Sequence, residues 1–211
     1  MFPLGTVLFP GMVMPLQVFE PRYKVMVAEV LAGDGEFGVV LIERGSEVGG
    51  GDTRFDVGCR ARVIETRATD DGRFLLAAVG TGRIRIEQWL DDDPYPRALV
   101  TDVVDDGPAP SGPGGDDSGG SGADFVTMDA IRRRVDELVG ILAPDRVGTL
   151  QLPNEPAVFV DAVAGAFGFG ALDAQRLLAT RGVGARLDVL GELVDDALVV
   201  ARLRRGDTGA Q

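Results

Sequence analysis

The first half of the chain alternates between apolar and polar positions in short runs, which is the pattern of half-buried β-strands. Residues 83–87 alternate cleanly, and residues 37–42 form a continuous apolar run typical of a strand buried on both faces. Turn signals at residues 70–72 and 80–82 separate neighbouring runs. The pattern predicts strands at residues 12–18, 37–42, 57–69, 73–79, 83–87 and 95–104, with a bulge at Gly58.

One helix is expected within this series of strands. Glu20-Pro21 marks its start, because proline is tolerated in the first turn, and Gly33 marks its end. Six strands with short turns and one inserted helix indicate a small, mostly antiparallel, curled sheet or β-barrel.

The second half changes to helical periodicity. Four amphipathic helices are expected, and such helices bury their apolar stripes against one another or against a sheet. Pro144 ends the first helix and Pro156 begins the second; a short helix covers residues 172–180, and the last covers residues 185–205. The stripes include Met128, Ile131, Val135, Leu138 and Leu142, then Val160, Ala164 and Phe167, and finally Leu187, Leu190, Val194, Leu198 and Ala201.

The two halves are separated by residues 107–122, a stretch rich in Gly, Pro, Ser and Asp without a large apolar side chain. Such a stretch cannot bury enough apolar area to offset the entropy of ordering it, so a flexible linker is expected. We therefore predict an α+β protein with a β-barrel subdomain at residues 1–104, a linker at 105–123 and an α-helical bundle at 124–206.

Composition indicates an ordinary soluble globular protein, with 211 residues of which 45% are hydrophobic and 26% charged. No window approaches eighteen consecutive apolar residues, and the start lacks the charged and apolar regions of a signal peptide. A single cysteine, Cys59, fits a reducing compartment. A cytoplasmic location is the resulting expectation.

The net charge and the absence of certain residue types exclude several classes of partner and of catalytic site. The net charge of −12 disfavours nucleic acid and anionic membranes as partners, because both carry negative charge. The chain has no histidine and one lysine, so it excludes Ser-His-Asp or Cys-His catalysis and histidine-bearing zinc sites. Lys24 precedes Val25, whereas a phosphate-binding P-loop needs Ser or Thr there. We expect no catalytic residue, no metal site and no cofactor.

Two local motifs favour a structural interpretation. Residues 33–38 match the formula G-x-G-x-x-G, but they follow a helix and precede a strand, the reverse of a dinucleotide site, so a plain turn is expected. Cys59 is followed by Arg60 and Arg62, which could lower the pKa of its thiol, but in a strand its side chain points opposite to theirs, so a buried structural cysteine is expected.

Several segments together resemble the Lon N-terminal, or substrate-binding, domain family. The most specific block lies at the start, and the later ones support it, so that the resemblance covers most of the chain outside the linker. The segments are FPL (2–4), VLFPG (7–11), PLQVFEPRY (15–23), GVV (38–40), VGCRARV (57–63), FLLAAVGTGR (74–83), QRLL (175–178) and ARL (185–187).

The resemblance implies a PUA-like β-barrel followed by a helical bundle. In full-length Lon proteases this unit precedes an ATPase and a Ser-Lys peptidase, and the chain shows neither, which leaves non-catalytic recognition of polypeptides. The implied partner is an unfolded or extended polypeptide, or a component of a proteolytic system. In the opening block we expect prolines to hold an extended path and Phe9 and Phe19 to anchor it to the core.

Exposed apolar side chains near the junction of barrel and bundle are the expected contacts for such a partner. The candidates are Met12, Met14, Phe167 and Phe169. Two other functions stay open at this point. PUA-like barrels elsewhere bind RNA, which the acidity disfavours, and a hydrolase that uses carboxylates would need two buried acidic groups facing each other across a cleft.

Overall fold

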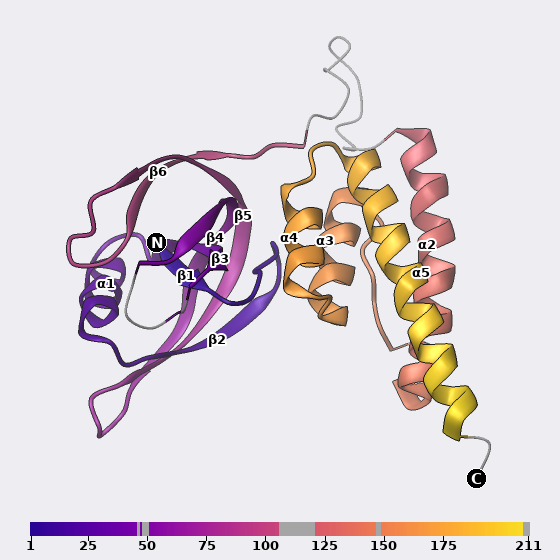
Figure 1. Cartoon of the computed structure of the whole chain (residues 1–211), viewed down its shortest axis with the longest axis horizontal. Helices are drawn as coiled ribbons and strands as arrows, with labels where there is room; N and C mark the ends of the chain where they lie inside the picture. The colour runs from indigo at the N-terminus through magenta and orange to yellow at the C-terminus, as the bar shows by residue number, and fades with distance from the viewer. Residues whose placement is uncertain (46, 48–50, 106–120, 147–148, 209–211) are drawn as a thin grey trace. The chain divides into compact units, whose positions relative to one another are not determined.

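The computed structural model shows an α+β protein: strands with one inserted helix come first in the sequence, and helices follow (Figure 1). It forms two compact units, and we describe each by itself. Unit 1 comprises Met1–Val104 and Gly170–Ala179; unit 2 comprises Asp105–Phe169 and Thr180–Gln211. The structure describes residues 1–45, 47, 51–105, 121–146 and 149–208. The linker expected at residues 105–123 therefore falls almost entirely outside the described residues.

Unit 1 is built on a six-stranded sheet, with strand order β1-β3-β4-β5-β2 and β6 also paired with β5. The β1–β3 pair is parallel and the other pairs are antiparallel, as expected for a mostly antiparallel sheet. The helix α1 (Pro21–Ala32) lies between β2 and β3 in the sequence, as predicted. The strands are β1 (Phe2–Leu4), β2 (Val13–Val18), β3 (Glu36–Arg44), β4 (Thr53–Ala68), β5 (Phe74–Leu90) and β6 (Arg97–Asp102).

The sheet is strongly curled but open, which corrects the expected closed barrel (Figure 1). Among the described residues no strand pairing joins β1 to β2, the two strands at the ends of the order. Both strands are poor partners for closure. β1 has three residues and contains Pro3, and β2 contains Pro15; a proline has no N–H to donate to a ladder.

The glycines at positions 58 and 80 lie where another backbone segment passes close by. Residues 80–82 do not form the predicted turn, because β5 runs through them. At Gly58 the pairing of β4 with β3 is irregular directly after the Val40–Gly58 pair, in agreement with the predicted bulge. A Cβ on Gly80 would lie 2.2 Å from the backbone oxygen of Phe9, and a Cβ on Gly58 would lie 2.2 Å from that of Val39. Both glycines therefore permit close approach of another backbone segment.

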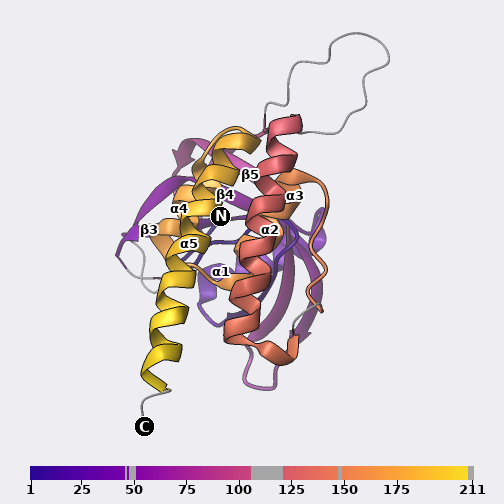
Figure 2. The ribbon, with the colours of Figure 1, turned by 90° about the vertical axis from the view of Figure 1, so that its right-hand side faces the viewer.

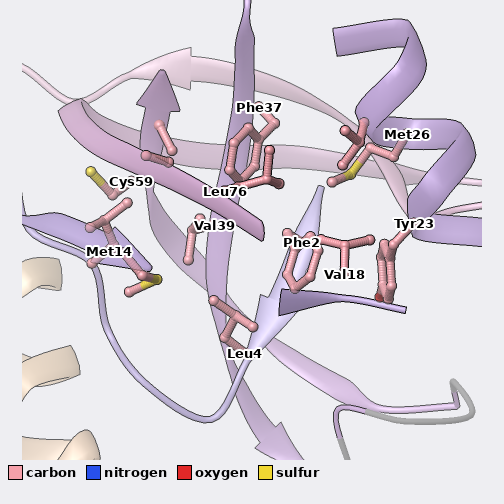
Figure 3. Close-up of a cluster of buried hydrophobic side chains, with 14 residues drawn as sticks. Phe2, Leu4, Met14, Val18, Tyr23, Met26, Phe37, Val39, Cys59 and Leu76 are labelled. Carbon is pink, nitrogen blue, oxygen red and sulfur yellow. The ribbon is translucent and has the colours of Figure 1, made fainter. Parts of the chain in front are cut away.

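The core of unit 1 fills the inside of the curled sheet (Figure 3). Phe2 stacks on Tyr23 of α1 with ring centroids 4.4 Å apart, which fastens the helix to the sheet. Cys59 is fully buried, as expected of a structural cysteine. Phe9 is a core residue, as predicted, but Phe19 is 48% exposed, so the prediction that it anchors the chain to the core is wrong.

The helix α4 (Ala171–Ala179) belongs to unit 1 by its contacts, although the sequence interpretation grouped residues 124–206 as one bundle. Two buried hydrogen bonds hold it. The Gln175 side-chain amide donates to the Val57 carbonyl at 2.9 Å, and Nη1 of Arg83 donates to the Leu178 carbonyl at 2.9 Å. The Arg83 bond also satisfies a carbonyl in the last turn of α4, where carbonyls lack partners within the helix.

Unit 2 consists of helices packed through the predicted apolar stripes. Ser121 and Asp124 form a capping box that begins α2. The stripes of α2 and α5 are buried, except that Leu142 is exposed at the end of α2. The helices α2 and α5 run side by side (Figure 2). The described elements are α2 (Gly122–Leu142), the short η1 (Pro144–Arg146), α3 (Pro156–Phe167) and α5 (Val183–Thr208).

A buried ion triad links three segments of unit 2. Arg186, at the start of α5, pairs with Asp161 of α3 and, at 2.9 Å, with Asp105. Only 1% of the arginine side chain is exposed, so the two carboxylates supply the partners that water would otherwise provide.

Candidate polypeptide-binding surface

The four contact residues proposed from the sequence lie in different environments. Met14 is buried in the core of unit 1, where it has no surface to offer a partner, and Met12 is partly buried against the same core. Phe167, at the end of α3, and Phe169 are partly exposed in unit 2. The structure thus divides the set between two units and removes Met14 from consideration; contact through the other three remains a prediction.

A broader apolar surface lies on the outer side of the sheet, where β5 is flanked by β2 and β4. Residues directly opposite one another in an antiparallel pair point to the same side of the sheet. Val13 faces Val79 and Pro15 faces Ala77, while Leu75 faces Gln17. On β4, Glu65 faces Ala77, and Ile64 is the extra residue of the bulge that precedes it. Arg62 and Arg67 face Val79 and Leu75, so charged residues border the apolar surface on this side. We call this set the β2 face; it comprises Val13, Pro15, Ile64, Leu75, Ala77 and Val79.

The large side chains of the β2 face are well exposed. Val13 is 53% exposed, Ile64 is 55% exposed and Leu75 is 41% exposed. The opposite side of β2 is ordinary core, since Met14 and Val18 are buried there. An apolar outer side on a strand whose inner side is already apolar is unusual, because antiparallel sheets normally present polar residues to water. Contiguous exposed apolar residues of this kind mark interaction surfaces.

A small pocket lies where the two end strands of the open sheet approach one another. It has a volume of about 50 Å³ and combines aromatic rings, carboxylates and one amide. The pocket exists because β1 and β2 are not hydrogen-bonded to each other; a ladder between these two strands would close the gap. We call it the seam pocket; it is lined by Phe2 of β1, Gln17 and Val18 of β2, Phe19, Glu20, Tyr23 of α1 and Glu47.

The seam pocket adjoins the β2 face at Gln17, which lines the pocket and also lies opposite Leu75. Its exposed rim includes Phe19, the aromatic residue expected in the core. Large aromatic residues with exposed rings are frequent anchors at binding surfaces. An extended chain lying along β2 would therefore meet apolar side chains first and the pocket at the end of the strand.

Charges around the seam pocket are held in place by local contacts. Glu20 accepts a hydrogen bond from Arg22 Nε at 3.1 Å, and the Arg22 guanidinium lies 4.5 Å from the centroid of the Tyr23 ring. Oε1 of Glu47 accepts a hydrogen bond from the backbone N–H of Gly5. Burial raises the pKa of Tyr23 to about 12, so its hydroxyl is neutral at physiological pH.

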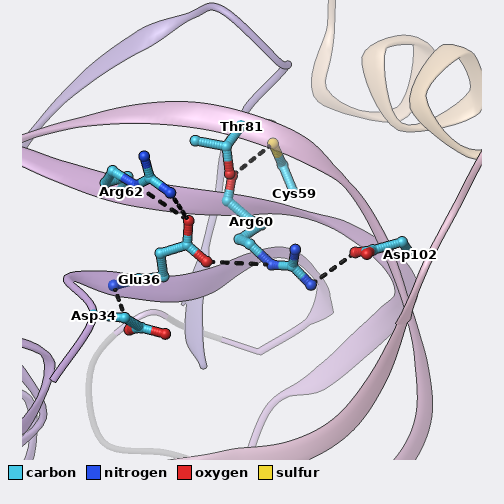
Figure 4. A network of polar contacts seen from close by, with 7 residues as sticks. All are labelled: Asp34, Glu36, Cys59, Arg60, Arg62, Thr81 and Asp102. Atoms are coloured by element: carbon cyan, nitrogen blue, oxygen red, sulfur yellow. Dashed lines mark hydrogen bonds and ion pairs between the residues drawn. The ribbon is translucent and has the colours of Figure 1, made fainter.

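Beside the β2 face, a network of ion pairs occupies the arginines of β4 (Figure 4). Glu36 accepts from Arg62 at 2.7 Å and lies 3.7 Å from Arg60, which also pairs with Asp102 at 2.7 Å. The two positive charges thus face two carboxylates. A phosphate backbone needs arginines whose charge is uncompensated, so this surface gives no support to RNA binding.

The structure also bears on the hydrolase alternative. Two buried carboxylates do come together, Asp105 and Asp161, but the guanidinium of Arg186 lies between them and compensates their charge. The two carboxylates are thus joined through one buried guanidinium, which gives no support to acid–base catalysis by this pair. Within the described ranges there is no group of three or more potential metal ligands, and no helix has the length and apolarity needed to cross a bilayer.

A second concave area lies on unit 2 between α2 and α5. It is a shallow, wide-open depression lined by Glu137, Gly140, Ile141, Arg202 and Arg205. Glu137 and Arg202 pair with each other across it. An open depression crossed by an internal ion pair offers less to a ligand than the seam pocket does.

Comparison with known proteins identifies the family. The profile of the ATP-dependent protease La (LON) substrate-binding domain matches residues 1–196. The chain belongs to this family. The match extends over both units, and it confirms the resemblance seen in the opening block of the sequence.

Individual relatives of this Lon substrate-binding domain protein agree. The Lon protease of Desulfosudis oleivorans is 25% identical over 203 residues, which cover 93% of this chain and 23% of the relative. The Lon protease of Cytophaga hutchinsonii is 32% identical over 100 residues, covering 47% of this chain and 12% of the relative. The chain thus spans at most about a quarter of the length of these curated relatives.

Solved structures show the same fold. A Lon N-terminal domain protein from Xanthomonas campestris superimposes with a TM-score of 0.62 at 23% identity, covering 90% of this chain and 94% of that one. The N-terminal domain of Lon protease from the Mycobacterium avium complex gives a TM-score of 0.65 at 18% identity, covering 92% and 97%.

Proposed function

We propose that this protein is a non-catalytic recognition module that binds unfolded or extended polypeptides through the β2 face and the seam pocket. The observation that carries the proposal is the row of exposed apolar side chains on β2, β4 and β5, which ends at an exposed aromatic ring. Family membership supports the polypeptide as the partner. The proposal includes a cytoplasmic setting and a PUA-like fold for the curled sheet.

The proposal that the module has no enzymatic role rests on residue types. The chain has no histidine, its only lysine lies in α1, and its buried acidic pair is compensated by Arg186. What the described surface offers is apolar contact. We therefore propose that the protein acts as an adaptor or a decoy for a proteolytic system, since it can hold a polypeptide and has no evident means to cleave it.

Binding through the β2 face should be weak. Full burial of a Val, Leu or Ile side chain contributes about 1.5–3 kcal/mol, and Val13, Ile64 and Leu75 have about half of that left to gain. Together they contribute about 2–5 kcal/mol, while association and ordering of a flexible chain oppose binding by several kcal/mol. These three side chains alone do not exceed that cost. A dissociation constant on the order of 100 µM, equivalent to about −5.5 kcal/mol, therefore requires further contacts, which we assign to the seam pocket.

The test is a titration of fluorescently labelled, reduced and alkylated ribonuclease A with the purified chain. Ile64→Ser should weaken binding about 4- to 15-fold, since it removes about 0.8–1.6 kcal/mol of apolar contact. Leu99→Ser is the matched control, because Leu99 is 54% exposed on β6 and lies outside the β2 face. It should change the affinity less than twofold.

Two outcomes contradict the proposal. If the unfolded protein does not bind at several hundred micromolar, the chain recognises something else, and a folded partner becomes the better explanation. If Ile64→Ser and Leu99→Ser weaken binding equally, polypeptides bind, but the β2 face is not where they do so.

A further inference from the structure

We infer, resting on the proposed function, that the seam pocket binds the tip of a lysine side chain carried by the bound polypeptide. The inference is drawn from the size of the pocket, the groups on its walls and its position at the end of the β2 face.

Size limits the ligand to a few atoms. A cavity of about 50 Å³ accommodates roughly three to five atoms the size of a water molecule, since one such position takes about 10–15 Å³. The ammonium group and the last one or two methylenes of a lysine fit this space. A planar guanidinium with its five N–H donors requires more room, and a cofactor or nucleotide requires far more.

The groups that line the pocket are of the types that bind an ammonium group. Glu20 and Glu47 each contribute a carboxylate, and Gln17 adds an amide oxygen. A carboxylate accepts about four hydrogen bonds, so the bonds to Arg22 and Gly5 leave capacity on both groups. The rings of Phe2, Tyr23 and Phe19 line the same pocket. Aromatic rings attract cations and pack against methylenes.

The opposing charges do not reverse this preference. The N-terminus of α1 and the Arg22 guanidinium are positive, but Arg22 is engaged by Glu20 and by the Tyr23 ring. With Glu47 included, the pocket walls and their nearest partner carry two negative charges and one positive charge. The whole chain has a net charge of −12, which adds long-range attraction for a basic segment.

The seam pocket lies at one end of the β2 face. Gln17 lies two residues beyond Pro15 along β2, and strand residues rise by about 3.3 Å each. An extended polypeptide whose apolar residues cover Val13 and Pro15 therefore brings a side chain a few residues away to the pocket. The preferred segment is apolar with a lysine at one end.

The experiment compares three short labelled peptides, identical and apolar except at one position near the end, which holds lysine, norleucine or glutamate. Norleucine keeps the aliphatic stem and removes the charge. The wild-type protein should bind the lysine peptide about five- to tenfold more tightly than the norleucine peptide, with the glutamate peptide weakest. Glu47→Gln should reduce the lysine preference to less than twofold, and its amide oxygen can still accept from Gly5.

Glu43→Gln is the matched control. Glu43 is exposed on β3 and outside the pocket, and the substitution changes the net charge equally. It should leave the lysine preference intact. Equal binding of lysine and norleucine peptides by the wild type, or an equal loss of preference in both variants, would overturn the lysine site while the proposed function stands. If neither the peptides nor unfolded ribonuclease binds, the proposed function itself fails.

Discussion

Replacing Arg186 by methionine should destabilise unit 2 more than any loss of a surface ion pair. Arg186 pairs with Asp105 and Asp161, and the side chains of all three are nearly buried: 1%, 11% and 10% exposed. The substitution fills much of the same space with an apolar chain. It leaves two carboxylates close together without the guanidinium that pairs with both.

The magnitude follows from that environment. Removing one partner of a buried ion pair costs about 3–5 kcal/mol, because the remaining charge is buried without compensation. Whole domains are stable by only about 5–15 kcal/mol, so the loss should be plainly measurable. Arg134→Met is the comparison: Arg134 pairs with Asp195 near the surface, where the two side chains are 32% and 55% exposed, and surface pairs contribute about 0.2–1 kcal/mol.

Urea unfolding can follow the two units separately. Far-ultraviolet circular dichroism is dominated by helices, most of which lie in unit 2, and the single tryptophan, Trp89, reports on β5 of unit 1. Arg186→Met should shift the dichroism transition strongly. Adding Asp161→Asn should recover part of the loss, because it removes one of the two neighbouring negative charges. The reasoning is refuted if Arg186→Met costs no more than Arg134→Met, or if Asp161→Asn destabilises the double variant further.

Three other predictions concern unit 1. Gly80→Ala should destabilise unit 1 by about 1–3 kcal/mol in urea unfolding, because the new Cβ meets the backbone oxygen of Phe9. Gly82→Ala should be neutral or slightly stabilising, because nothing lies within 4 Å of its Cβ position. Equal effects of the two substitutions would contradict the close-approach role of Gly80. Phe9→Ala should lower the free energy of unfolding by about 3–5 kcal/mol, because Phe9 is buried. Phe19→Ala should lower it by less than about 1 kcal/mol and should weaken polypeptide binding. An unchanged affinity would remove Phe19 from the site. In a spectroscopic titration both tyrosines should ionise at a higher pH than a free tyrosine does. Burial is the main cause of the raised pKa of Tyr23, and a hydrogen bond to Glu29 is the main cause of the raised pKa of Tyr95. Since the unfolded chain loses these protons near pH 10, stability should fall as the pH rises from 10 towards 12.

Periodicity was enough to predict the parts of the fold that depend on local pattern. The helical stripe that ends at Ala201 is buried throughout α5, and the inserted helix begins after Glu20 and ends at Gly33, as capping residues indicated. Cys59 is buried because the strand turns its side chain away from Arg60. These outcomes depend only on spacing and on the alternation of strand side chains.

The features that escaped prediction depend on contacts distant in sequence. The sequence does not reveal that Gly80 meets the backbone of Phe9, so its glycines were interpreted as a turn. Hydrogen bonds to Val57 and from Arg83 place α4 in unit 1, and neither partner is near α4 in the sequence. Apolar residues on the outer side of β2 look the same in sequence as those inside.

The candidate site shows the same limit. Met12 and Met14 were chosen because methionine suits adaptable surfaces, but the alternation of β2 turns Met14 into the core and Val13 outwards. The exposed bulge residue Ile64 and the seam pocket arise from strand pairing. The one sequence feature that could have indicated Phe19 as a site residue is its position at the centre of the proline-flanked block at residues 15–23.

The central claim is that polypeptides lie on the β2 face, and site-directed photo-crosslinking tests it most directly. Because Cys59 is fully buried, a cysteine introduced at the surface can be labelled selectively with a benzophenone in the folded protein. Ile64→Cys and Leu99→Cys give two labelled proteins with probes of equal exposure, one inside the β2 face and one outside it. We predict that unfolded ribonuclease crosslinks several-fold more to the Ile64→Cys protein and that excess unlabelled polypeptide competes. Equal crosslinking at the two positions, or stronger crosslinking through Leu99→Cys, would contradict the account.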